Sequence, residues 1–227
     1  MAGTATTSTD EAALWSDVSP DAARRLLHAG LECFAARGYH ATTTRDIARR
    51  AGMSPAAVYV HFPSKADLLY RISLTGHEMA WASVQDALVG RTDTIDRLRS
   101  VVSSFTAFHG RYHRLARVSQ HELRSLHEPH FRTIVEMRHR FAPLVEAELL
   151  AGVANGSFVI DDIAGTALAI LSLPVDLTRW FDPAGRRSPE HIGELYADLT
   201  LRMISARRDE SAGAIRNGLD RQSPALS

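Results

Sequence analysis

Tyr59 and His61 are the side chains whose chemistry stands out, because both offer hydrogen-bond donors on a short predicted helix at residues 55–61. The helix begins with a proline and two alanines, whose small side chains let its backbone approach the floor of a groove. A phenol and an imidazole further along suit the phosphate oxygens that border such a groove. The pattern therefore favours nucleic-acid recognition over catalysis.

Three helix starts between residues 43 and 64 position that short helix. Each start joins a hydroxyl residue to a first-turn carboxylate or proline: Thr43 with Asp46, Ser54 with Pro55, and Ser64 with Asp67. Between the first two helices, Gly52 can adopt the positive φ that ends one helix and turns the chain tightly into the next. The spacing predicts a helix-turn-helix, with residues 55–61 as its recognition helix.

The same stretch resembles the tetracycline-repressor (TetR) family of transcriptional regulators, over residues 21–71. The motifs are Thr43-Thr44-Arg45, Ile47-Ala48, Ala51-Gly52, Tyr59-x-His61-Phe62 and Ser64-Lys65-x-x-Leu68. The resemblance implies phosphate contacts by Thr43, Thr44, Tyr59, His61 and Lys65. It implies groove-facing positions for Arg45, Pro55, Ala56 and Ala57, and we place Ser54 with these predicted DNA-binding residues.

Charge supports a local rather than a global nucleic-acid signal. The whole chain has a formal net charge of zero, whereas residues 19–71 hold eight basic and four acidic side chains. Lys65 is the only lysine of the chain and falls at a predicted helix start. We therefore expect a basic DNA-binding domain on an acidic remainder.

The chain divides into four predicted parts. Residues 1–18 are expected to form a disordered arm, 19–63 the DNA-binding domain, 64–206 a ligand-binding and dimerisation domain, and 207–227 a disordered tail. The expected fold is all-α with about nine helices. A single cysteine, Cys33, no signal-peptide pattern and no long apolar run predict a cytoplasmic protein without a membrane span, and no cofactor is expected.

The larger domain is predicted to bind a small apolar or amphipathic effector. Aromatic side chains are spread over its predicted helices, and we take them as candidate ligand contacts: Trp81, Phe105, Phe108, Tyr112, Phe131, Phe141 and Trp180. One long segment after Pro129 contains Pro143, where we expect a kink. Residues 152–161 are rich in glycine and polar residues and are expected to form a loop.

A homodimer is expected from the last two helices. Residues 163–181 are almost free of charge, and a second apolar stripe follows at 189–206. Pairing of these helices across a twofold axis would place two recognition helices about 34 Å apart, which matches successive major grooves of a palindromic operator. The expected partners are double-stranded operator DNA, the effector and a second copy of the chain.

The segment at 179–189 resembles the corresponding part of TetR-type regulators of fatty-acid and sterol catabolism, whose inducers are acyl-coenzyme A thioesters. The resemblance makes an acyl-coenzyme A a candidate effector, with Arg179, Arg186 or Arg187 meeting phosphates and Trp180 stacking on adenine. The same segment equally fits a plain loop between two dimer helices.

Three alternatives remain: a metal site, a helical enzyme and a helical protein without DNA binding. For a metal site, six of the eleven histidines lie from His109 to His139, and His109 and His113 share one helix face, but no second cysteine or carboxylate cluster completes the set of ligands. Solvated or ligand-facing histidines fit better. A helical enzyme lacks any phosphate loop, dinucleotide motif or nucleophile elbow. A helical small-molecule-binding or adaptor protein without DNA binding would show no steep loss of DNA affinity with salt.

Overall fold

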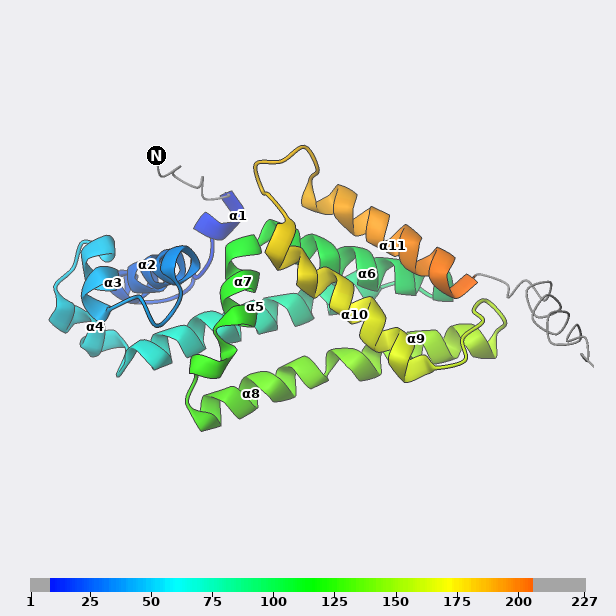
Figure 1. Cartoon of the computed structure of the whole chain (residues 1–227), viewed down its shortest axis with the longest axis horizontal. Helices are drawn as coiled ribbons and strands as arrows, with labels where there is room; N and C mark the ends of the chain where they lie inside the picture. The colour runs from blue at the N-terminus through cyan, green and yellow to red at the C-terminus, as the bar shows by residue number, and fades with distance from the viewer. Residues whose placement is uncertain (1–8, 206–227) are drawn as a thin grey trace, which may run out of the picture.

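The computed structural model describes residues 9–205, and every regular element in this part of the chain is helical. The elements are α1 (Thr9–Ala12), α2 (Asp21–Arg37), α3 (Thr44–Ala51), α4 (Pro55–His61), α5 (Lys65–Leu88), α6 (Thr94–Arg111), α7 (His113–His121), η1 (Leu123–Ser125), α8 (Glu128–His139), α9 (Phe141–Ala154), α10 (Ile163–Trp180) and α11 (Pro189–Ser205). The all-α class is confirmed. Figure 1 shows a small domain of α2, α3 and α4 at one end of the molecule, joined by α5 to a larger helical domain.

Local capping explains the short helices of the small domain. Thr43 and Asp46 form a complete capping box on α3, and Gly52 ends that helix with a φ of 67°. Ser64 likewise accepts from the Asp67 N–H at the start of α5. The Ser54 hydroxyl makes no capping bond, because the Ala57 N–H donates to the Ser54 carbonyl at 3.0 Å. Pro55 occupies the first turn of α4, as expected.

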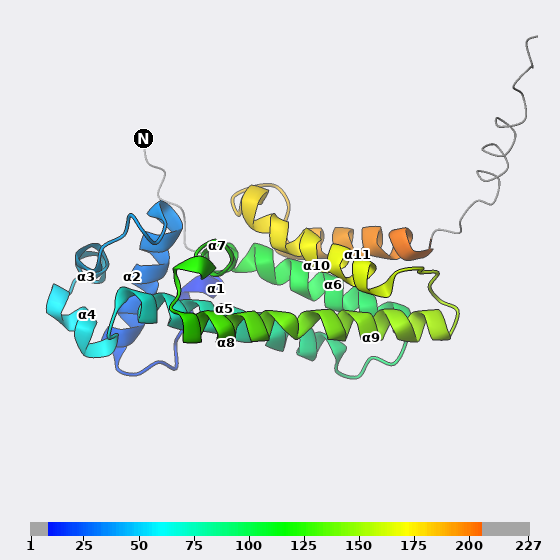
Figure 2. The same ribbon diagram turned by 60° about the horizontal axis from the view of Figure 1, so that its bottom comes forward.

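The larger domain is built around α6. This helix packs against α5, α9, α10 and α11, and Figure 2 shows it between the layer of α10 and α11 and the line of α8 and α9. The expected single segment after Pro129 is divided at Arg140, three residues before Pro143, so the helix is interrupted one turn before the predicted kink position. Pro143 lies in the first turn of α9, where a missing N–H leaves no helical bond unmade.

The helix α9 also extends into the predicted loop at 152–161 and ends only at Ala154. Gly152 is buried in it, and a Cβ atom at this position would lie 1.9 Å from the Phe158 ring. Glycine therefore serves close packing here rather than a turn. Asp162 caps α10 by accepting from the Gly165 N–H, and the Ser188 hydroxyl accepts from the His191 N–H at the start of α11.

Residues 9–18 belong to the fold, so the prediction of a disordered arm is wrong for them. Trp15 is 5% exposed, and its indole N–H donates to Thr75 Oγ1 at 2.9 Å. The Arg114 guanidinium donates to buried Glu11 with an Nε–Oε2 distance of 2.6 Å. These two residues attach the segment to α5 and α7. Residues 1–8 and the predicted tail at 207–227 lie outside the described residues.

Cys33 is buried, as expected for a small apolar side chain. No helix within residues 9–205 is long and apolar enough to cross a membrane.

Candidate functional site

The predicted DNA-binding residues lie on one contiguous part of the small domain, on α3, on α4 and at the helix starts. Most of them are exposed: Thr43, Arg45, Ser54, Pro55, Ala56 and Tyr59. Thr44, Ala57, His61 and Lys65 are half-buried. The hydroxyls of Thr44 and Tyr59 lie 3.2 Å apart and connect α3 to α4. The structure thus brings the predicted residues together on a surface that a DNA duplex can reach.

Burial separates the two faces of α4. Val58 is fully buried and anchors the helix on the domain core, whereas Tyr59 is 56% exposed. Sequence reasoning missed Val60, which is 77% exposed beside Tyr59. An apolar side chain in that position suits the methyl group of a thymine in a major groove. The sequence did contain the information. In a seven-residue helix whose buried face is set by Val58, Val60 lies two positions further along and must point to a different side of the helix.

Lys65 holds the segment before α3. Its ammonium donates to the Tyr39 carbonyl at 2.8 Å and to the Thr42 carbonyl at 2.7 Å, and it lies 3.9 Å from the centre of the Tyr39 ring. Burial lowers the pKa of Lys65. Two of its three N–H groups are therefore used inside the domain. The phosphate contact that the family resemblance implies stays a prediction.

Asp46 organises the charge at the start of α3. Hydrogen bonds from the hydroxyl and backbone N–H of Thr43 lower the pKa of Asp46 to about 2. Arg37 and Arg49 also lie within ion-pair distance of this carboxylate. The carboxylate is thus ionised at neutral pH, and its charge is balanced before any DNA approaches.

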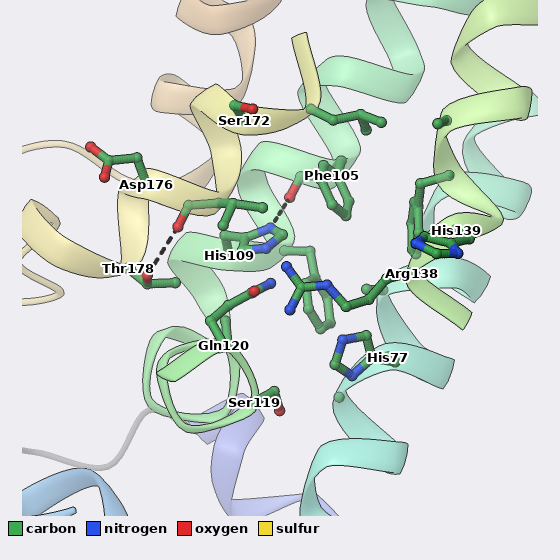
Figure 3. A pocket seen from close by; sticks show the side chains of 18 of the residues that line it. His77, Phe105, His109, Ser119, Gln120, Arg138, His139, Ser172, Asp176 and Thr178 are labelled. Atoms are coloured by element: carbon green, nitrogen blue, oxygen red, sulfur yellow. Dashed lines mark hydrogen bonds between the residues drawn. The ribbon is translucent and has the colours of Figure 1, made fainter. Parts of the chain in front are cut away.

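A cavity of about 970 Å³ occupies the larger domain (Figure 3). Its floor comes from buried residues of α5, α6 and α7, and residues of α8, α9 and α10 complete its wall and form its exposed rim. Of the predicted ligand contacts, Phe105, Phe108, Phe141 and Arg179 line it. A space of this volume with largely apolar walls fits a small organic ligand.

Four predicted ligand contacts are absent from the lining. Trp81 packs edge-on against Phe141 behind the wall, with the Arg140 guanidinium 4.2 Å from its ring centre. Tyr112 packs behind Phe108, Phe131 packs on the core cluster near the small domain, and Trp180 is 48% exposed. Three of the seven predicted aromatic contacts thus face the cavity, and Trp81 and Tyr112 pack behind them.

Polar groups on the cavity wall were mostly missed by sequence reasoning. His77 of α5, Ser119 of α7 and Arg138 of α8 face the same space from three different helices (Figure 3). No spacing in the sequence connects them. His109 was expected to be solvated or ligand-facing, and it lines the cavity with only 2% of its surface exposed.

Both buried histidines are neutral at physiological pH. Burial lowers the pKa of His77 and of His109 to about 4 in each case, against hydrogen bonds to backbone carbonyls that raise it. Their Nδ1 atoms lie 2.7 Å from the Ser73 carbonyl and 2.8 Å from the Phe105 carbonyl. Since a carbonyl only accepts, Nδ1 carries the proton in both rings.

Two protein-family models match the chain. The model described as "Bacterial regulatory proteins, tetR family" matches residues 26–72, and "Tetracyclin repressor-like, C-terminal domain" matches residues 91–204. The HTH-type transcriptional repressor KstR2 of Mycolicibacterium smegmatis is 31% identical over 189 residues, which cover 81% of this chain and 91% of that protein.

Solved structures share the fold. A bacterial regulatory protein in the tetR family from Rhodococcus RHA1 is 41% identical, with a TM-score of 0.78, over 83% of this chain and all of that chain. AibR, solved in complex with isovaleryl coenzyme A and operator DNA, is 22% identical, with a TM-score of 0.71, over 81% of this chain and 97% of its own.

Proposed function

Since the chain belongs to the tetR family of bacterial regulatory proteins, we propose that it is a homodimeric repressor released from a palindromic operator by an acyl-coenzyme A thioester. The family membership itself makes the protein a DNA-binding transcriptional regulator and not an enzyme. The proposal adds the dimer, the palindrome and the class of effector. One observation carries it: two of the helices that line the cavity, α5 and α7, also pack against α2 of the small domain.

The mechanical link runs through α7 and the first turn of α5. Ser119 and Gln120 of α7 line the cavity, and α7 also packs against α2. Just beyond α7, the Ser125 hydroxyl lies 3.3 Å from His40 Nε2, within the segment that Lys65 holds. A ligand that displaces α7 or α5 therefore moves the small domain, and it favours release only if it binds the displaced arrangement more tightly.

An acyl-coenzyme A fits a cavity with an apolar interior and an exposed arginine at its rim, Arg179, which also lies 3.3 Å from Asp176. Phe105, Phe108 and Phe141 supply an interior for an acyl chain, and exposed Arg179 is placed at the rim to meet phosphate. Trp180, next to it and half exposed, presents a ring for adenine. AibR, which has the same fold, binds isovaleryl coenzyme A and operator DNA according to its structure.

We expect decanoyl-coenzyme A to bind at least about tenfold more tightly than decanoyl-pantetheine, which keeps the thioester but lacks every phosphate and the adenosine. The Arg179→Gln variant should lose most of that difference, because a hydrogen bond to a charged group contributes about 1.5–3 kcal/mol. Isothermal titration calorimetry measures both ligands. Arg91→Gln removes an exposed arginine away from the cavity and serves as the control. Equal affinity of the two ligands for the wild type would remove the phosphate contacts from the proposal.

Arg45 and Lys65 should differ in what they contribute to DNA binding. We expect Arg45→Ala, on an exposed groove-facing position, to cost about 1–3 kcal/mol at the operator and to relax base preference. Lys65→Ala should weaken binding to all sequences alike. Fluorescence anisotropy with operator and scrambled duplexes separates the two effects. If Arg45→Ala reduces specific and non-specific binding equally, Arg45 does not read bases.

A further inference from the structure

The inner wall of the cavity holds a cationic side chain that lacks an anionic partner. Arg138 is half-buried, and none of the described carboxylates lies within 4 Å of its guanidinium. Glu146 and Asp176 also line the cavity, but Asp176 is paired with Arg179 at 3.3 Å. Burial also lowers the pKa of Arg138.

Two buried polar atoms without a partner belong to residues that line the same cavity. Ser119 is 3% exposed and His77 is 6% exposed, and both line the cavity. The buried atoms Ser119 Oγ and His77 Nε2 have no hydrogen-bond partner among the described residues. Buried polar atoms are nearly always paired in folded proteins, so the Ser119 hydroxyl is expected to donate to a group in the cavity. In Figure 3, Arg138 extends into the space between His77 and Gln120.

The nature of the missing group follows from the donors that surround it. Arg138 offers up to five N–H donors and the Ser119 hydroxyl offers one more, whereas His77 Nε2 is an acceptor in the neutral ring. A carboxylate accepts from both donors and neutralises the guanidinium. A neutral hydroxyl would instead donate to His77 and leave the charge of Arg138 uncompensated.

We propose that the effector carries a carboxylate at the end that enters the cavity, bound by Arg138 with a hydrogen bond from Ser119. This inference rests on the proposed function in one respect: it takes from it that the coenzyme A group lies at the rim of the cavity near Arg179. The acyl group would be that of a dicarboxylic acid, thioesterified at one end and ionised at the other. The apolar part of the cavity holds the carbon skeleton between the two.

The test compares probes that differ only at the buried end: decanoyl-, 10-hydroxydecanoyl- and sebacoyl-coenzyme A, whose chains end in methyl, hydroxyl and carboxylate. Wild-type protein should bind the carboxylate probe at least about tenfold more tightly than the methyl probe, by about 1.4 kcal/mol. The Arg138→Met variant should lose this preference while it keeps its affinity for decanoyl-coenzyme A. Arg132→Met removes an exposed arginine from the same helix α8 and should retain the preference.

Decanoate and its neutral isostere decanamide separate this inference from the thioester proposal. If none of the three coenzyme A probes binds but decanoate binds at least about tenfold more tightly than decanamide through Arg138, the carboxylate site stands and the thioester proposal fails. Four results overturn the carboxylate site. They are equal affinity within each matched pair, a preference that survives Arg138→Met, tightest binding of the hydroxyl probe, and failure of every carboxylate probe to bind.

Discussion

The double substitution Leu173→Glu with Leu199→Glu is expected to convert the protein from a dimer to a monomer and to weaken operator binding by at least about a hundredfold. Leu173 of α10 is 43% exposed and Leu199 of α11 is 47% exposed. Further apolar side chains on the same two helices are also exposed, namely Leu168, Trp180 and Met203. Large apolar residues that are exposed on two adjacent helices indicate an interaction surface. If that surface forms the twofold dimer interface, the double variant would bury two glutamate carboxylates from each protomer.

The loss of DNA affinity follows because a monomer contacts one half-site only, so the second recognition helix no longer contributes to the same binding event. Sedimentation velocity gives the mass, which should fall to the 25.0 kDa of one chain, and anisotropy gives the operator affinity. Leu150→Glu is the matched control, because this leucine is 56% exposed on α9. A variant that stays dimeric, or a monomer that keeps full operator affinity, contradicts the assignment of α10 and α11 to the dimer.

The small domain was predictable because its signals are local. The capping box of Thr43 with Asp46 and the positive φ of Gly52 depend on residues a few positions apart. Helix starts, helix ends and the tight turn followed from these residues alone. The role of Lys65 did not, because its partners, the carbonyls of Tyr39 and Thr42, lie more than twenty residues earlier in the chain.

The prediction of a disordered N-terminal arm was wrong for residues 9–18 for a related reason. Its composition is small and acidic, which is typical of a mobile arm, and two anchors decide the outcome instead. Glu11 binds Arg114, which lies 103 residues later, and Trp15 binds Thr75, which lies 60 residues later. Neither partner is visible from the composition of the segment.

The sequence predicted that the larger domain binds an apolar ligand, but it identified only some of the residues that line the cavity. Aromatic content indicated an apolar interior, and Phe105, Phe108 and Phe141 do line it. Trp81 has the same signal in sequence, yet it supports the wall from behind. The polar wall of His77, Ser119 and Arg138 is assembled only when α5, α7 and α8 pack, so it has no pattern along the chain.

Saturating acyl-coenzyme A is expected to raise the dissociation constant for the operator by about a hundredfold, a coupling of about 2.7 kcal/mol. The reason is that α5 and α7 both line the cavity and contact the small domain, so a ligand selects one spacing of the two recognition helices. By linkage, bound operator must weaken ligand binding by the same factor. Coenzyme A without an acyl chain is the control and should leave the operator affinity unchanged.

The most direct test of this mechanism is the operator dissociation constant, measured by anisotropy with and without decanoyl-coenzyme A at a concentration that calorimetry shows to be saturating. The operator is first selected from random DNA. We predict that the dissociation constant rises by about two orders of magnitude, within reach of the coupling energies seen between protein sites. An operator affinity that stays unchanged when the cavity is fully occupied would contradict the account.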